Sequence, residues 1–113
     1  MRALASIALA LVLTAEATET CPHEAPSGWD YPFECCSGAD CAQLDPKAVK
    51  ANASGFIVTV VPGQHPIWSR DRRHPLVLEI AYRKARLSPD GKWHLCINDA
   101  GDLLCFFAPA GGS

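Results

Sequence analysis

The stretch YPFECCSGADC, residues 31–41, places three cysteines within seven positions and makes Cys35 and Cys36 direct neighbours. The six cysteines of the chain are Cys21, Cys35, Cys36, Cys41, Cys96 and Cys105. An even set in a chain of 113 residues is typical of a small exported domain, in which thiols pair and remain paired. We therefore expect all six cysteines to form structural disulfides.

The N-terminal residues have the layout of a secretory signal peptide. A single positive charge at Arg2 precedes an apolar run over residues 3–13, and small residues follow at Ala15 and Ala17. The run is shorter than the roughly 20 apolar residues that cross a bilayer, so it is expected to direct export and not to span a membrane. The sequence predicts a signal peptide over 1–17 and a mature chain over 18–113.

The mature chain is expected to fold as one small disulfide-stabilised β domain. Residues 18–44 are rich in Pro, Gly and Ser and have no period, which predicts an irregular Cys-rich segment. Residues 55–107 are expected to form the β core. The fold class that we expect is small, disulfide-rich and mainly β, an antiparallel meander of about four to five strands with at most one short helix.

Local patterns within the mature chain support this fold class. The runs FIVTVV, residues 56–61, and PLVLEIAY, residues 75–82, are rich in β-branched and apolar residues and are typical of strands. Asp45 followed by Pro46 is a typical start of a short helical segment. The composition therefore predicts β structure with little helix.

Two turn motifs predict the C-terminal third. SPDG, residues 88–91, and NDAG, residues 98–101, have the pattern of hairpin loops that end on a left-handed glycine. They would join strands over about 83–87, 92–98 and 102–107.

The length of the second loop decides how the two late cysteines lie. With a three-residue loop, Cys96 lies opposite Leu104 and Cys105 opposite Leu95, on different faces of the sheet. A loop of two or four residues would instead make Cys96 and Cys105 neighbours that are able to bond to each other.

The adjacent cysteines suggest a clamp. In an extended segment, neighbouring side chains point to opposite sides, so Cys35 and Cys36 can each reach a different face. Our hypothesis is that Cys96 and Cys105 each bond to one member of the group Cys35, Cys36 and Cys41, and that Cys21 takes the remaining member. Six cysteines allow about fifteen connectivities in all, and the sequence does not choose among those that satisfy these conditions.

The predicted meander has one apolar face. This face carries Trp93, Leu95, Leu103 and Phe107, which we expect to form the core. His94 alternates with Trp93 and Leu95, so we expect a solvent-facing or hydrogen-bonded strand residue and not a general base.

Charge is distributed unevenly along the mature chain. Residues 18–45 contain acids and no Lys or Arg, whereas six bases fall between residues 64 and 86. These bases are Arg70, Arg72, Arg73, Arg83, Lys84 and Arg86. Either the acidic segment folds back over the basic one, or the bases form a patch for an anionic partner.

One aromatic residue lies among these bases. Trp68 stands beside Arg70, Arg72 and Arg73, and this group is the candidate binding surface, because an aromatic ring and guanidinium donors suit anionic or sugar ligands. In the alternative interpretation, Trp68 fills the core and the arginines pair with the acidic N-terminal segment.

A metal or thiol site is the rival interpretation of the cysteines. Cys36, Cys41, His94 and Cys96 are ligand types that suit zinc or copper, although their spacing matches no strong zinc pattern. No Cys-x-x-Cys, Gly-x-Ser-x-Gly or His-Glu-x-x-His motif is present. We expect neither a catalytic residue nor a cofactor.

In combination, YPFECCSGADC, SPDGKWHLCIN and LCFFAPAGGS resemble parts of small exported proteins of alphaproteobacteria such as rhizobia. The likeness covers both ends of the mature chain and is weak between about residues 45 and 80. It implies a bacterial periplasmic or secreted location and carries over no site residue. Cys21 is an addition to the usual cysteine set of these proteins.

The functional expectation combines these observations. We expect a non-enzymatic binding or cell-envelope interaction domain, whose partner is an anionic envelope component or a protein. Nucleic acid is not an expected partner, because the chain is slightly acidic and lacks a nucleic-acid-binding motif. The alternative function is a periplasmic metal-binding or thiol-handling protein that uses the Cys/His group.

Overall fold

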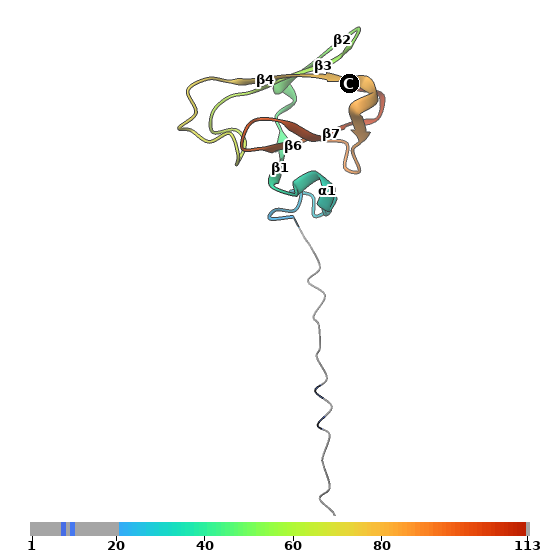
Figure 1. Cartoon of the computed structure of the whole chain (residues 1–113). Helices are drawn as coiled ribbons and strands as arrows, with labels where there is room; N and C mark the ends of the chain where they lie inside the picture. Colours follow the sequence, from blue (N-terminus) through green and yellow to red (C-terminus); the bar gives the residue numbers. More distant parts are fainter. Residues whose placement is uncertain (1–7, 9, 11–20, 113) are drawn as a thin grey trace, which may run out of the picture.

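The computed structural model describes Ala8, Ala10 and residues 21–112, so the predicted signal peptide and the predicted mature start at Thr18 fall almost wholly outside the described residues. Two β-sheets make up the described fold (Figure 1). In chain order the elements are α1 (Phe33–Cys36), β1 (Ala39–Leu44), the 3-10 helix η1 (Pro46–Ala48), β2 (Val49–Asn52), β3 (Gly55–Val60), β4 (Leu76–Ala81), η2 (Tyr82–Lys84), β5 (Ala85–Leu87), β6 (Trp93–Asn98), β7 (Leu103–Ala108) and η3 (Ala110–Gly112).

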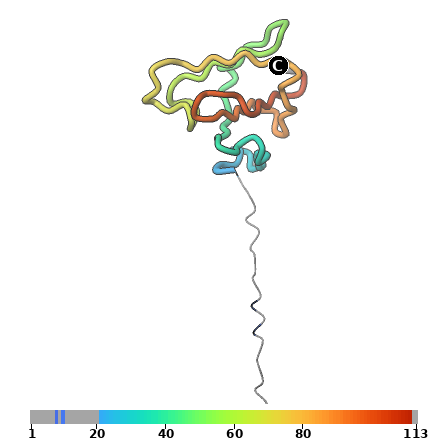
Figure 2. Tube along the Cα trace, in the orientation of Figure 1, coloured from blue at the N-terminus to red at the C-terminus, as the bar shows by residue number. Residues whose placement is uncertain are grey.

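The structure has three layers. One sheet has the strand order β2-β3-β4 and the other has the order β1-β6-β7-β5. The segment that leads into α1 lies on the side of β6 and β7 that faces away from the first sheet (Figure 2). The sheet containing β6 is therefore covered on both faces. Five of the six residues of β6 are buried, and Asn98 is partly buried.

The main core lies between the two sheets. Phe56, Val58 and Val60 of β3 point inward at every second position, as the period of a half-buried strand requires. They meet apolar side chains of the other sheet, and the rings of Phe56 and Trp93 lie 5.4 Å apart in an edge-to-face arrangement.

The expected fold class is confirmed. The described chain is mainly β, with three disulfides and one short α-helix, and its seven strands exceed the expected four to five. Both apolar runs form strands, β3 and β4. Asp45 caps η1 by accepting a hydrogen bond from the Lys47 amide, which confirms the predicted short helical start.

Two predictions about the topology were wrong. The segment 18–44 is not wholly irregular, because residues 39–44 form β1, which pairs with β6 along its whole length. The strands β5 and β6 do not form a hairpin, because β5 pairs in parallel with β7 and the connection to β6 passes that strand. The turn at 88–91 therefore joins two strands that are not neighbours.

The predicted register of the last hairpin was also wrong, although its turn was right. The Asn98 amide donates to the Asp102 carbonyl at 3.1 Å, as a three-residue loop requires. A β-bulge then shifts the pairing, so that Ile97 lies opposite Leu103 but Cys96 lies opposite Cys105. The two late cysteines are thus cross-strand neighbours and do not lie on opposite faces.

The bulge also changes which aromatic residue fills the main core. Phe106 packs between the sheets with Trp93 and Leu95, whereas Phe107 lies on the opposite face, beside the N-terminal segment. The core position predicted for Phe107 was therefore wrong, because one extra residue in β7 reverses the direction of every side chain that follows.

The disulfide partners follow the clamp hypothesis, but the two bonds to the last hairpin lie on one face of the sheet and not on opposite faces. Cys35 bonds to Cys105, and Cys41 bonds to Cys96. Cys21 takes the remaining cysteine, Cys36. Cys35 and Cys36 belong to the single turn of α1 and not to an extended segment, so it is the helical turn that directs their side chains to different partners. We call Cys35–Cys105 and Cys41–Cys96 the disulfide clamp.

Candidate functional site

Asp90, in the turn at 88–91, is the acceptor on which the N-terminal segment docks. Its carboxylate accepts hydrogen bonds from Ser27 Oγ at 2.6 Å and Trp29 Nε1 at 3.0 Å. Within its own turn it accepts from Ser88 Oγ at 2.7 Å and the Lys92 amide at 2.9 Å. The turn thus places one carboxylate where two distant parts of the chain meet.

His94 connects this carboxylate to the buried Tyr31. Nε2 of His94 donates to Asp90 at 2.8 Å, because a carboxylate can only accept. Nδ1 lies 2.8 Å from the hydroxyl oxygen of Tyr31. No part of the His94 side chain is exposed, so the hydrogen-bonded alternative predicted from the sequence is found and the solvent-facing one is not.

Electrostatics assign the protons in this network. Burial, followed by the charges of Asp90 and Asp40, raises the pKa of Tyr31, so its hydroxyl keeps its proton and donates to Nδ1 of His94. Burial alone would raise the pKa of Asp90, but the hydrogen bonds from Ser27, His94 and the turn outweigh it and hold that pKa well below its usual value. Asp90 therefore remains a carboxylate.

The network Asp90–His94–Tyr31 has the order of a proton relay but is enclosed. The rings of Trp29 and Phe107 pack edge-to-face and at a tilt around His94 and Tyr31. Because His94 and Tyr31 are buried, a solute cannot reach either ring in this arrangement. The role that this geometry supports is structural: the network joins the N-terminal segment to β6.

His65 is a second buried histidine. Its Nε2 donates to the Leu95 carbonyl at 2.9 Å, and its Nδ1 accepts from the Ile67 amide at 3.1 Å. Burial lowers the pKa of His65 below its ordinary value, and the bond to Leu95 offsets only part of this effect. The neutral ring thereby joins the long loop between β3 and β4 to the middle of β6.

The alternative metal set is divided among disulfides. Cys36 bonds to Cys21, while Cys41 and Cys96 bond to each other, so none of these three sulfurs is a free thiolate. The fourth member, His94, has both nitrogens in hydrogen bonds. Within the described residues, no group of three or more His, Cys, Asp or Glu is placed to hold a metal ion.

In the candidate surface around Trp68, Trp68 and Arg72 are held by contacts within the protein, whereas Arg70 and Arg73 are exposed. Trp68 is half-buried against the main core, and its Nε1 donates to the His74 carbonyl at 2.9 Å. The guanidinium of Arg72 lies 4.2 Å from the ring centre and pairs with Asp99 at 2.9 Å. Arg70 and Arg73 are exposed. The core interpretation of Trp68 is thus closer to the structure.

The ion pairs only partly match the predicted folding of acidic over basic segments. Arg86 pairs with Glu34 of α1 at 3.0 Å, which joins the two segments. Arg72 pairs with Asp99, which lies in the last hairpin and not in the N-terminal segment. In the part of the chain that the structure describes, the other four bases make no ion pair.

A second surface lies where β4 continues into β5, and the sequence indicated its cations but not the exposed apolar residues beside them. Leu87 is 70% exposed and Tyr82 is 48% exposed, and the exposed cations Arg83 and Lys84 lie between them in sequence. We call Tyr82, Arg83, Lys84 and Leu87 the basic-apolar surface. Its signal in the sequence is the run YRKARL, residues 82–87, in which three cations lie among apolar residues.

The basic-apolar surface borders a mainly apolar hollow of about 280 Å³. Phe56, Tyr82 and Leu87 line it together with residues 108–111, and Arg86 is the charged residue in its lining. The rings of Phe56 and Tyr82 lie 5.0 Å apart, so the hollow opens next to the main core.

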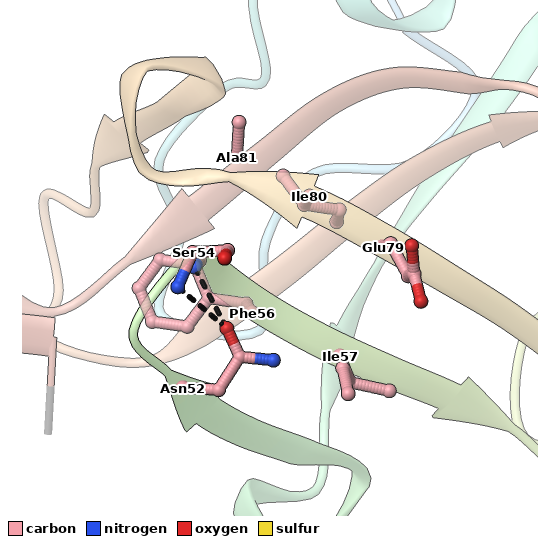
Figure 3. A pocket seen from close by; sticks show the side chains of 8 residues that line it. Asn52, Ser54, Phe56, Ile57, Glu79, Ile80 and Ala81 are labelled. Carbon is pink, nitrogen blue, oxygen red and sulfur yellow. Dashed lines mark hydrogen bonds between the residues drawn. The ribbon is translucent and has the colours of Figure 1, made fainter.

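Another hollow, of about 350 Å³, lies at the hairpin between β2 and β3 (Figure 3). The Asn52 side-chain oxygen there accepts from the amides of Ser54 and Gly55, at 2.8 and 3.0 Å. Glu79 is the one charged residue in its lining. Because the Asn52 oxygen already accepts two hydrogen bonds within the turn, this hollow has fewer polar groups available to a ligand than the basic-apolar surface has.

Comparison with known proteins adds no relative. No protein-family model, curated protein or solved structure matches the chain. Among the described residues, there is no helix with the length and apolar character needed to cross a membrane.

We predict that Asp90→Ala lowers the free energy of unfolding by about 3 kcal/mol, because several partly or fully buried donors lose their acceptor. Denaturant unfolding followed by near-UV circular dichroism measures this change. Asp99→Ala is the matched control, since it removes the carboxylate of an exposed ion pair and should cost little. Equal effects of the two variants would contradict the role of Asp90.

We also predict that the free energy of unfolding falls as the pH drops below about 6.5, the ordinary pKa of histidine. Because burial lowers the pKa of His65, the folded protein binds this proton less readily than the unfolded chain does, and the slope ends below the folded pKa.

The measurement is a series of denaturant unfolding curves from about pH 8 to about pH 5, compared with the same series for His65→Gln. His23 and Asp40, whose charges act on His65, are unchanged in the variant, as is His94. The variant should show a shallower dependence on pH. An identical slope in both proteins would contradict the assignment.

Proposed function

We propose that the chain is an exported, non-enzymatic binding domain that attaches to an anionic lipid layer of the cell envelope through the basic-apolar surface. The observation that carries this proposal is the exposure of Arg83 and Lys84, two cations without an ion pair in the described structure, which lie in sequence between the exposed residues Tyr82 and Leu87.

Charge supports an anionic partner. Arg86, the neighbouring base, is held by Glu34, so Arg83 and Lys84 are the cations of this surface that remain free to meet a new anion. Each cation near an anionic lipid surface contributes about 1 kcal/mol of attraction, and this attraction weakens with salt.

The apolar residues of the basic-apolar surface favour a lipid layer as the partner and not a free anion. Leu87 presents an aliphatic side chain to solvent, and Tyr82 presents a ring whose hydroxyl donates to the Asn52 carbonyl. Aromatic rings and long cationic side chains suit the boundary between headgroups and acyl chains. The adjoining hollow offers further apolar contact.

The scaffold supports a binding role in the envelope. All six cysteines are in disulfides, which persist in an oxidising compartment. The basic-apolar surface follows directly on β4 and is anchored by β5 to β7, so its side chains project from ordered elements.

Vesicle binding tests the proposal. The mature protein should sediment with vesicles that contain phosphatidylglycerol and not with pure phosphatidylcholine vesicles, and binding should fall as salt increases. Arg83→Glu with Lys84→Glu should weaken the binding at least about 10-fold, because two attractive contributions become repulsive.

The matched control is Arg70→Glu with Arg73→Glu, which changes the net charge equally but lies in the loop between β3 and β4. This control should bind the anionic vesicles much better than the Arg83 and Lys84 variant does. An equal loss in both variants, or absence of binding to anionic vesicles at low salt, would contradict the proposal.

A further inference from the structure

We propose that the Cys21–Cys36 disulfide is a thiol–disulfide exchange site, which an external dithiol reduces while the disulfide clamp keeps the domain folded. The inference does not depend on the proposed function. It rests on the access, the position and the surroundings of this bond.

Access distinguishes the three disulfides. Cys21 is partly exposed, whereas the other five cysteines are buried. Exchange begins when a thiolate attacks a disulfide sulfur, so its rate depends on whether that sulfur can be reached. In the folded protein, Cys21 therefore offers the point of entry, and neither bond of the clamp offers one.

Position makes the opening of this bond tolerable. Cys21 and Cys36 are 15 residues apart, whereas the two clamp bonds span 55 and 70 residues. A short loop restricts the unfolded chain less than a long one, so its opening removes less stability. Cys35–Cys105 still holds α1 to β7, and Trp29 and Tyr31 keep their bonds to Asp90 and His94.

The surroundings suit the reduced pair. Sγ of Cys21 lies 3.2 Å from the Tyr31 carbonyl oxygen and 3.5 Å from that of Pro32. Sγ of Cys36 lies 3.5 Å from the Phe33 carbonyl oxygen. Once reduced, each thiol has an acceptor within reach, and a stabilised dithiol form makes the corresponding disulfide a stronger oxidant.

The reaction balances with a dithiol as the co-reactant. One thiolate of the dithiol attacks Sγ of Cys21, which forms a mixed disulfide and releases Cys36 as a thiolate that takes up a proton. The second thiolate of the dithiol then displaces Cys21. The dithiol is oxidised to a disulfide by loss of two electrons, and Cys21 and Cys36 become thiols.

The test is reduction of the folded mature protein with dithiothreitol without denaturant, followed by alkylation and mass spectrometry at a series of times. Cys21 and Cys36 should become alkylated at least about 10-fold faster than the other four cysteines, since attack depends on access. One dithiothreitol should be oxidised per protein in this fast phase, with the near-UV circular dichroism retained.

Two variants sharpen the test. Cys21→Ala with Cys36→Ala should lack the fast phase and keep the slow reduction of the clamp. Cys41→Ala with Cys96→Ala, if it folds, should keep the fast phase. Results on the unsubstituted protein are enough to overturn the proposal. Reduction of all six cysteines in one step with loss of the near-UV signal would do so, and so would reduction of a clamp bond before Cys21–Cys36.

Discussion

The disulfide clamp organises the described structure, because its two bonds join the N-terminal part of the chain to β6 and β7. Cys35–Cys105 attaches α1 to the face of β6 and β7 that points away from the main core, and Cys41–Cys96 joins the paired strands β1 and β6 on the same face. A short domain gains only a limited hydrophobic core, and a bond between residues far apart in sequence restricts the unfolded chain strongly. The clamp thereby turns a segment with little regular structure into a third layer.

The buried polar network follows from this third layer. His94 alternates with core residues on β6, so without the N-terminal segment its ring would face solvent. With Trp29 and Tyr31 packed over it, the ring needs a partner for each nitrogen, which Asp90 and Tyr31 supply. Among the described residues, no buried side-chain nitrogen or oxygen lacks a hydrogen-bond partner. The clamp and the network thus bury His94 without leaving a polar atom unsatisfied.

Much of this scaffold could be predicted from residue types, and the rest could not. The early cysteine group and the even cysteine set indicated bonds to the last hairpin, but not that Cys35 and Cys41 form these bonds while Cys36 bonds to Cys21. The bulge in β7 has no signal in LCFF, residues 104–107, and yet it brings Cys96 opposite Cys105 and removes Phe107 from the main core. The parallel pairing of β5 was missed because SPDG is a common hairpin turn, whereas here it supplies the Asp90 acceptor. The basic-apolar surface could not be predicted, because the sequence shows the cations but does not show that Leu87 beside them is exposed.

Disulfide mapping of the unreduced mature protein tests the clamp most directly. Cleavage after acidic residues separates Cys41 from the adjacent pair at Asp40 and Cys96 from Cys105 at Asp99 and Asp102, and fragmentation between Cys35 and Cys36 resolves the pair. We expect the Cys41 peptide to be linked to the Cys96 peptide, and the adjacent pair to be linked to Cys105 through Cys35 and to Cys21 through Cys36. A peptide in which Cys96 is bonded to Cys105 would contradict the clamp, because neither Cys35 nor Cys41 could then be bonded to the last hairpin.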